Sequence, residues 1–246
     1  MSDFNKPYLS VVIPAHNEEK RITKTLEEID AYLRKQNYPY EIIVVSDGST
    51  DKTSAIIKNL KFKIKNLELI ENKENRGKGY VVRQGMLEAK GEHRLFSDAD
   101  NSTSLDQIEK IWPEIEKGYD IIIGSRDIKG AILDPPQPFL RSIILGEGFK
   151  LFRKIIIGLW ELEDTQCGFK MFTAKAVEEI FPKCRINRFA FDPEILVLAP
   201  KMGYKIKEIP VYWKNSAESK VKFKSMVKMG IDLLKIRLNL MTKIYG

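Results

Sequence analysis

Two aspartates stand two residues apart in the stretch FSDADNSTS, residues 96–104, directly after an apolar run. In an extended strand, residues i and i+2 face the same side, about 6.6 Å apart, so Asp98 and Asp100 can converge on one ligand. Mg²⁺ and Mn²⁺ prefer hard oxygen ligands of this kind and commonly keep positions for substrate phosphates. The pair therefore predicts a divalent-metal site.

The same stretch also resembles the start of a helix. Ser104 and Gln107 have the spacing of a capping box, and aspartates near a helix start interact favourably with the helix dipole. The box would use Ser104 and Gln107 and leave Asp98 and Asp100 without a structural task. We therefore expect a metal site followed by a helix cap.

Four further polar clusters lie between apolar runs: PAHNE (14–18), SDGS (46–49), NRGKG (75–79) and GSR (124–126). Asp47 could accept an N–H group of a base, and Asn17 and Glu18 could either cap a helix or bind a ribose and base. Lys78 offers charge to a phosphate beside flexible glycines, although a solvated basic turn explains that loop equally well. The chain has neither a GxxxxGK[ST] loop nor a GxGxxG after its first strand.

Strands and helices must position these polar clusters. The apolar and β-branched runs predict strands at 8–14, 41–46, 67–71, 93–97 and 120–124, and the spacing of Ile22, Leu26, Ile29 and Leu33 predicts an amphipathic helix between the first two. Alternating strands and helices favour a mostly parallel, Rossmann-like α/β sheet flanked by helices. Such sheets bind ligands beyond the carboxyl ends of their strands, where the polar clusters fall.

The composition is that of one folded unit with an anionic partner. The 246 residues carry a net charge of +7, which favours nucleotide phosphate, nucleic acid or an acidic membrane surface. Cys167 and Cys184 lack metal-ligand spacing, so we expect buried, idle thiols in a reducing cytoplasmic compartment. With no leader before the first apolar run, no secretion is expected.

The C-terminal segment is strongly basic and apolar. We predict a catalytic domain at 1–221 and a C-terminal basic amphipathic helix at 222–246, which could lie on a membrane surface or dock on the protein with a solvated lysine face. A membrane span is not expected at 139–160, because that segment contains five charged residues.

Six motifs, PAHNE, SDGS, NRGKG, SDAD, GSR and DTQCGFK (164–170), occur in an order that resembles the family 2 inverting glycosyltransferases with the GT-A fold. Within that family the likeness is greatest to the dolichyl-phosphate β-glucosyltransferases and other polyprenyl-phosphate glycosyltransferases. Two positions depart from many members: His16 stands where they have Tyr, and Ser46 where they have Asp.

The resemblance implies a role for each matching residue. The base and ribose pocket would be lined by Pro14, Ala15, Asn17, Glu18 and Asp47, and the basic residue near the donor would be Lys78. The metal-binding DxD pair would be Asp98 and Asp100, and the acceptor phosphate would bind Arg126 and Arg141. Gln166 would lie near the metal or sugar, and the two acids near the reacting centre would be Asp164 and Asp192.

The resemblance also implies the reaction. A nucleotide sugar, UDP-glucose foremost, would give its sugar with inversion to a polyprenyl phosphate, dolichyl or undecaprenyl, with Mg²⁺ or Mn²⁺ as cofactor. We expect the protein to be peripheral on the cytoplasmic face of a membrane, without a nucleic-acid partner. The alternatives are GDP-mannose or another UDP-sugar as donor, a different acceptor, and a non-catalytic basic module that binds membrane or nucleic acid.

Overall fold

The structure, a computed structural model, describes residues 6–135, 148–214 and 223–245. Within these residues the main sheet has seven strands. In spatial order they are β3 (Leu67–Asn72), β2 (Tyr40–Asp47), β1 (Leu9–Ala15), β4 (His93–Ser97), β7 (Phe169–Thr173), β5 (Ile121–Ser125) and β8 (Ile206–Pro210). A small second sheet pairs β6 (Ile132–Asp134) with β9 (Tyr212–Lys214).

The parallel strands form where the sequence predicted them. Every residue of β1, LSVVIPA, is buried, as expected for a strand covered on both faces. Val11 pairs with Ile42 of β2 and with Leu95 of β4, both in parallel register. The predicted α/β class with a mostly parallel sheet is therefore confirmed.

One strand runs against the others. β7 pairs antiparallel with both β4 and β5, with Ser97 opposite Phe169 and Ile123 opposite Lys170. Its orientation places the start of β7 at the edge where β4 and β5 end. The loop that precedes β7 therefore lies at the carboxyl edge of the parallel strands.

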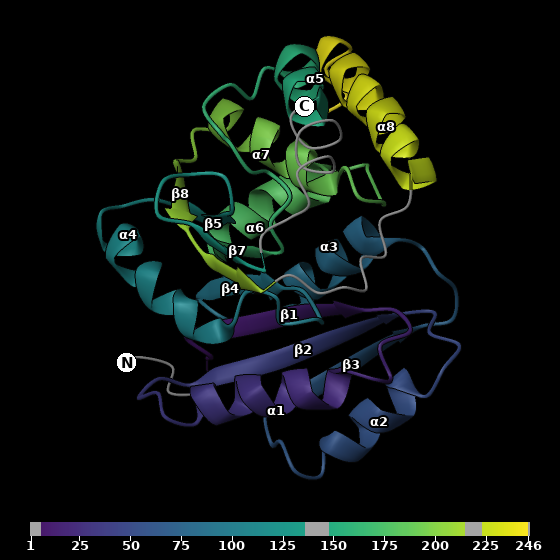
Figure 1. The fold of residues 1–246 in the computed structure, drawn as a ribbon, viewed down its shortest axis with the longest axis vertical. Helices are drawn as coiled ribbons and strands as arrows, with labels where there is room; N and C mark the ends of the chain where they lie inside the picture. Colours follow the sequence, from purple (N-terminus) through teal and green to yellow (C-terminus); the bar gives the residue numbers. More distant parts are fainter. Residues whose placement is uncertain (1–5, 136–147, 215–222, 246) are drawn as a thin grey trace.

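Helices cover both faces of the sheet (Figure 1). The cluster on one face joins buried residues of α1 (Ile22–Leu33), α2 (Thr53–Leu60) and the 3-10 helix η1 (Leu105–Lys110), next to α4 (Trp112–Glu116). The other face packs against α3 (Lys78–Glu88), α6 (Ala174–Ile180), the 3-10 turn η3 (Phe181–Lys183) and α7 (Phe191–Lys201). The predicted apolar stripe of α1 is buried, with Leu26 and Leu33 fully covered.

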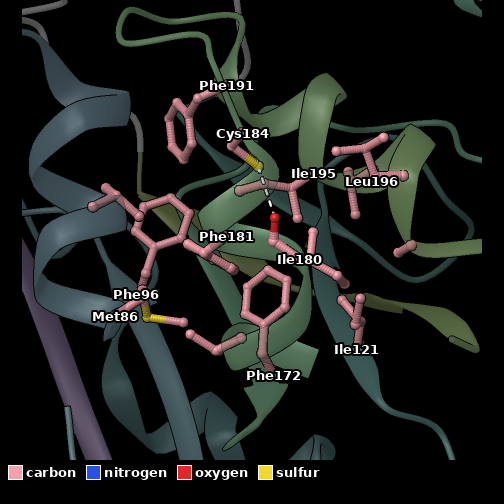
Figure 2. Packing of buried hydrophobic residues seen from close by; sticks show 14 of the residues in the cluster. Met86, Phe96, Ile121, Phe172, Ile180, Phe181, Cys184, Phe191, Ile195 and Leu196 are labelled. Carbon is pink, nitrogen blue, oxygen red and sulfur yellow. Dashed lines mark hydrogen bonds between the residues drawn. The ribbon is translucent and has the colours of Figure 1, made fainter. Parts of the chain in front are cut away.

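The larger core cluster includes Phe96 of β4, Ile121 of β5 and Phe172 of β7, whose side chains are drawn in Figure 2. Phe172 meets Phe181 edge to face with ring centroids 5.3 Å apart, and Phe96 lies 5.7 Å from Phe191. The thiol of Cys184 donates to the carbonyl of Ile180 at 3.5 Å. Both cysteines are buried and free, as predicted.

The C-terminal helix α8 (Phe223–Met241) packs beside α5 (Gly148–Ile157), and the two lie together in Figure 1. Leu233 and Ile236 of α8 are fully buried in the larger core cluster. The hydroxyl of Tyr245, past the helix end, donates to Glu194 at 2.7 Å. The helix is thus docked on the core that covers the sheet, while the predicted boundary at 221/222 lies outside the described residues.

No helix in the described ranges has both the length and the apolarity needed to cross a bilayer.

Candidate active site

Two lysines and two aspartates form an ion network at the carboxyl edge of the sheet. Lys78, the first residue of α3, places Nζ 2.6 Å from Asp98 Oδ1. Lys170 of β7 places Nζ 2.7 Å from Asp192 Oδ1 at the start of α7. Both ammonium groups also face the ring of Phe96, 5.4 and 5.2 Å from its centroid, which is within cation–π range.

Electrostatics couples the two pairs. Burial lowers the pKa of Lys78, but the carboxylates of Asp98 and Asp192 outweigh burial and raise it above the ordinary lysine value. Burial also raises the pKa of Asp192, and Lys170 and Lys78 offset only part of that rise. Lys78 is therefore a cation at neutral pH, held between two acids.

Asp98 and Asp100 lie in a tight turn rather than in an extended strand. β4 ends at Ser97, the N–H of Asn101 donates to the carbonyl of Asp98 at 3.1 Å, and Asn101 has a φ of 50°. The predicted strand geometry for the pair is therefore wrong. Both carboxylates nevertheless act on one cation, because each contributes to the raised pKa of Lys78.

The predicted capping box is also wrong. Ser104 makes no side-chain cap, and the helix that follows is the 3-10 helix η1. The amide of Gln107 instead donates to the carbonyl of Tyr212 and accepts from its N–H, each at 2.6 Å. This pair of bonds with a residue 105 positions away satisfies both ends of the amide, which a local cap would not do.

Gly168 brings the loop before β7 against the Asp98 turn. The N–H of Asp98 donates to the carbonyl of Gly168 at 3.1 Å. A Cβ atom at position 168 would lie 2.0 Å from Asp98 Oδ2, far inside contact distance. A side chain at position 168 would therefore displace the Asp98 carboxylate from its present place.

Asp164 holds Arg126 through two hydrogen bonds in a forked geometry. Arg126 donates Nε at 2.6 Å to Oδ2 and Nη2 at 3.0 Å to Oδ1, and its own N–H donates at 3.1 Å. The N–H groups of Gln166 and Cys167 also donate to Oδ1. Although burial opposes it, the Arg126 guanidinium holds the pKa of Asp164 well below its usual range, so this carboxylate remains ionised and fully engaged.

Arg126 and Gln166 both reach the surface of this edge. The Arg126 side chain is 23% exposed and lies over the ring of Trp213, 5.4 Å from its centroid. The Gln166 amide nitrogen lies 3.9 Å from the sulfur of Met229 on α8, so the DTQCGFK loop contacts the C-terminal helix. Arg141, the other predicted arginine, lies outside the described residues.

The predicted nucleotide residues surround the ends of β1 and β2. Pro14 and Ala15 complete β1, opposite Val45 and Ser46. The buried carboxylate of Asp47 accepts the N–H groups of Arg76 and Gly77, at 2.7 and 2.9 Å. It therefore holds the NRGKG loop directly before Lys78.

The neighbouring loop is anchored in a similar way. The side chain of Asn17 accepts from the N–H of Thr50 at 2.8 Å, and the N–H of Glu18 donates to Thr53 Oγ1 at 2.7 Å. The Glu18 carboxylate binds Arg21, three residues later. These contacts fix the β1 and β2 loops to each other beside the network around Lys78.

The donor set fits a magnesium or manganese ion that also binds substrate. Asp98 and Asp100 supply carboxylate oxygens, the ligand type these ions prefer. Across the residues that the structure describes, no group of three or more His, Cys, Asp or Glu side chains is arranged to hold a metal. A metal here would therefore rely on two protein carboxylates and on oxygen ligands from elsewhere.

Comparison with known proteins identifies the family. The model of glycosyl transferase family 2 matches residues 10–181. The chain belongs to glycosyltransferase family 2. The predicted membership, and with it the prediction of a sugar-transferring enzyme, is confirmed.

Several curated relatives of this family 2 glycosyltransferase are described as dolichyl-phosphate beta-glucosyltransferases. A dolichyl-phosphate beta-glucosyltransferase of Trichomonas vaginalis is 39% identical over 240 residues, covering 93% of this chain and 70% of the relative. The human dolichyl-phosphate beta-glucosyltransferase is 36% identical, covering 95% and 76%, and that of Saccharomyces cerevisiae is 34% identical, covering 99% and 78%.

Solved structures confirm the GT-A fold. Glucosyl-3-phosphoglycerate synthase from Mycobacterium tuberculosis, in complex with UDP, has a TM-score of 0.67 at 15% identity, covering 95% of this chain and 79% of the other. A mannosyltransferase from Pyrobaculum calidifontis, in complex with GDP-Man and Mn²⁺, has a TM-score of 0.62 at 19% identity, covering 97% and 65%.

Some residues of this candidate site were not predicted. Lys170 lies within the quoted DTQCGFK motif, but its contact with Asp192 joins residues 22 positions apart. Glu208 and Arg153 bind the backbone of the same loop from β8 and α5. The sequence patterns of β8 and α5 indicate a strand and an apolar helix, and neither pattern indicates that Glu208 or Arg153 binds this loop.

Proposed function

We propose that the protein transfers glucose from UDP-glucose to a polyprenyl phosphate of the dolichyl type, with inversion at the anomeric carbon. The observation that carries the proposal is the likeness to dolichyl-phosphate beta-glucosyltransferases of three organisms, at 34–39% identity over at least 93% of the chain. The arrangement of acids and bases at the carboxyl edge of the sheet supports it, because each charged part of the reaction finds a counterpart there.

The donor binds beside β1 and β2 in this proposal. Asn17, Glu18 and Asp47 line the base and ribose pocket next to the strand end at Pro14 and Ala15. Asp47 acts in part through the backbone, because its carboxylate holds the loop that presents Lys78. Lys78 contacts the diphosphate once it leaves Asp98.

Asp98 and Asp100 would hold the Mg²⁺ or Mn²⁺ ion together with the diphosphate. The bound ion would offset the negative charge that develops on the leaving UDP. Lys78 adds a second positive charge from the chain itself. Gln166, in the loop packed against Asp98, lies on the side where the sugar would sit.

The acceptor phosphate binds at Arg126 in this proposal. A phosphate oxygen attacks C1 of the glucose, the bond from C1 to the β-phosphate oxygen breaks, and UDP leaves with that bonding pair. Attack from the opposite side inverts an α-linked donor to a β-linked product. The phosphate is already an anion, so it needs orientation by an arginine more than deprotonation by a base.

The two remaining acids fit positioning tasks. Asp164 binds five N–H donors and keeps its low pKa, which makes it a poor proton acceptor. Asp192 is buried against Lys170 and neighbours Lys78. We propose that Asp164 orients Arg126 and that Asp192 holds Lys170, whose ammonium faces the same Phe96 ring as that of Lys78.

A lipid acceptor requires contact with a membrane, and the surface formed by α5 and α8 suits one. Ten of the 14 exposed large apolar side chains among the described residues belong to these helices or to the residues just after them. On α8 they form one stripe opposite its buried side, and exposed lysines and an arginine flank it. The stripe comprises Val227, Ile231, Leu234, Leu238 and Met241, and the flanking residues are Lys228, Lys235 and Arg237.

We therefore propose that the α5–α8 surface rests on an anionic membrane, which our sequence prediction places at the cytoplasmic face. The apolar stripe would enter the interface while the basic flanks meet lipid phosphates. The Met229 contact of Gln166 joins this surface to the site. The two alternatives that the sequence left for α8, docking on the protein and contact with a membrane, are compatible, because they use opposite faces of the helix.

Transfer is tested with purified protein, radiolabelled UDP-glucose, dolichyl phosphate and Mg²⁺ or Mn²⁺. We expect a butanol-extractable glucosyl lipid with a β-anomeric linkage. GDP-mannose and UDP-N-acetylglucosamine serve as competing donors. A lipid-linked sugar from GDP-mannose alone would replace the donor assignment, and no product from any donor would overturn the proposal.

Membrane binding is tested by flotation with vesicles of phosphatidylglycerol and phosphatidylcholine. Ile231→Glu combined with Leu238→Glu should abolish flotation, because both changes place charge in the exposed stripe. Phe62→Glu is the matched control, because Phe62 is 90% exposed on another part of the surface. Equal flotation of the two variants would contradict the assigned surface.

A further inference from the structure

Two peptide units before Asp164 are held from both sides by side chains of opposite charge. Glu208 on β8 accepts the N–H groups of Glu163 and Asp164, each at 2.9 Å. Arg153 on α5 donates Nη2 to the carbonyls of Leu162 and Glu163, at 2.8 and 3.4 Å. The guanidinium and the carboxylate thus bind the opposite ends of the same two peptide groups.

This arrangement is mutually reinforcing. Two successive N–H groups that point the same way form a concavity for an anion, which the Glu208 carboxylate fills. A guanidinium on the carbonyl oxygens polarises the same peptides, which strengthens their N–H bonds to the carboxylate. Residues on α5 and β8, 55 positions apart in the sequence, therefore fix one short stretch of backbone.

Stability alone does not account for Arg153. Arg153 is 1% exposed, and its Nη1 is buried with no hydrogen-bond partner among the residues that the structure describes. A buried, unsatisfied donor costs roughly 1–3 kcal/mol, and an apolar side chain of similar volume would avoid that cost. A charged group kept in such a place calls for a task other than packing.

The task follows from what comes next in the chain. Asp164, whose N–H is held by Glu208, holds the backbone N–H, Nε and Nη2 of Arg126. We propose that Arg153 and Glu208 are positioning residues, which clamp the backbone before Asp164 and thereby set the place of the Arg126 guanidinium. This inference rests on the proposed function, in which Arg126 binds the acceptor phosphate.

The clamp also connects the proposed membrane surface to the site. Arg153 points inward from α5, while Leu151 and Ile155 of the same helix are 54% and 61% exposed. The helix that would rest on lipid is thus bonded to the loop that holds Arg126. Helix α5 would therefore fix the position of Arg126 relative to the membrane surface that carries the lipid phosphate.

The test compares Arg153→Met, Arg153→Lys and Glu208→Gln with matched controls. Arg94→Met removes an arginine that is 4% exposed and also binds two backbone carbonyls, of Met86 and Gly91, at the opposite end of the sheet. Glu41→Gln removes a carboxylate that accepts the N–H of Lys90 at that end. The controls lose comparable bonds without touching the clamp.

The first readout is the Nε–H signal of Arg126 in a ¹⁵N NMR spectrum, assigned by its loss in Arg126→Lys. We expect Arg153→Met and Glu208→Gln to shift or broaden it, Arg153→Lys to do so less, and the controls to leave it unchanged. An unchanged signal in both Arg153→Met and Glu208→Gln would overturn the clamp. If Arg153→Met does not fold, Arg153→Lys and Glu208→Gln carry the test.

The second readout is kinetic, with farnesyl phosphate as acceptor. We expect the KM for farnesyl phosphate to rise on the order of tenfold in the clamp variants, because small misplacement of a binding group is costly. The KM for UDP-glucose should change by less than about twofold. Equal changes in both constants would show a general structural effect and overturn the positioning role.

The two readouts separate the clamp from the function. If the wild-type protein transfers no sugar to any polyprenyl phosphate, the proposed function fails. The Arg126 signal still tests the clamp in that case, because it needs neither donor nor acceptor.

Discussion

The Lys78 ammonium lies where a metal ion would bind Asp98. Replacing Lys78 should therefore strengthen the binding of Mn²⁺ to the free protein and weaken the binding of UDP. Lys78 Nζ lies 2.6 Å from Asp98 Oδ1, with the two side chains 23% and 33% exposed. A divalent ion that binds Asp98 must displace the ammonium. In Lys78→Gln this competition is gone, so the free protein should bind Mn²⁺ more tightly.

The size of the effect follows from the exposure of the pair. Breaking a partly exposed ion pair costs about 1 kcal/mol, which corresponds to about a fivefold lower Kd for Mn²⁺ in the variant. In the proposed function, Lys78 is released when the donor binds and then contacts the diphosphate. Loss of a hydrogen bond between charged groups costs roughly 1.5–3 kcal/mol, so Lys78→Gln should bind UDP about tenfold more weakly, or worse, at saturating Mn²⁺.

The Mn²⁺ affinity and the UDP affinity can both be measured on the purified protein. Electron paramagnetic resonance reports free Mn²⁺ during titration of the protein alone, and calorimetry reports UDP binding with Mn²⁺ present. Lys61→Gln is the matched control, because Lys61 pairs with Glu68 at 2.7 Å on an exposed surface, and Glu68 lies opposite Ile43, four residues before Asp47 on β2. Weaker or unchanged Mn²⁺ binding to the free Lys78→Gln protein would refute the competition.

Three further predictions concern the acids and the glycine of the site. Replacing Asp98 and Asp100 together by Ala should abolish Mn²⁺-dependent transfer in an initial-rate assay with and without chelator, and full activity would exclude their metal role. Gly168→Ala places a Cβ 2.0 Å from Asp98 Oδ2, so calorimetric titration should show weaker Mn²⁺ binding, and wild-type affinity would contradict the steric argument. Asp164→Asn should lower the free energy of unfolding by roughly 3–5 kcal/mol at neutral pH, because it leaves Arg126 without its buried partner. Because folding lowers the pKa of Asp164, its contribution to stability is complete above the unfolded pKa of about 3.9 and is lost as the pH falls through the folded pKa. In urea unfolding, the difference in free energy between the wild-type protein and Asp164→Asn should therefore shrink in acid. A difference that does not depend on pH would count against the pair.

The dual character of α8 illustrates how one sequence pattern serves two surfaces. Met229, Leu233 and Ile236 pack inward, while Ile231 and Leu238 face outward. From sequence, a helix apolar on most sides is compatible with docking and with lipid contact alike. The partner helix α5 settles which side is buried, because it covers one face and leaves the other.

Periodicity along the chain was sufficient for most of the frame. The buried runs of β1 and β2 and the stripe of α1 form as predicted, because their patterns arise from residues a few positions apart. Six motifs in order also indicated the family, since each follows or precedes a strand or helix that the same pattern predicts. Many of the charged residues at the carboxyl edge were therefore found, but Lys170 and the pairing of the charges were not.

Only the tertiary structure decided those partners. The antiparallel direction of β7 carries Gly168 to Asp98, and no local pattern encodes strand direction. Gln107 binds the backbone of Tyr212 rather than a local cap, and Lys170 pairs with Asp192, because burial favours whichever partner satisfies the whole polar group. The sequence by itself indicated most of the candidate site residues; the fold decided which of them touch, because contacts between distant residues depend on how the sheet is assembled.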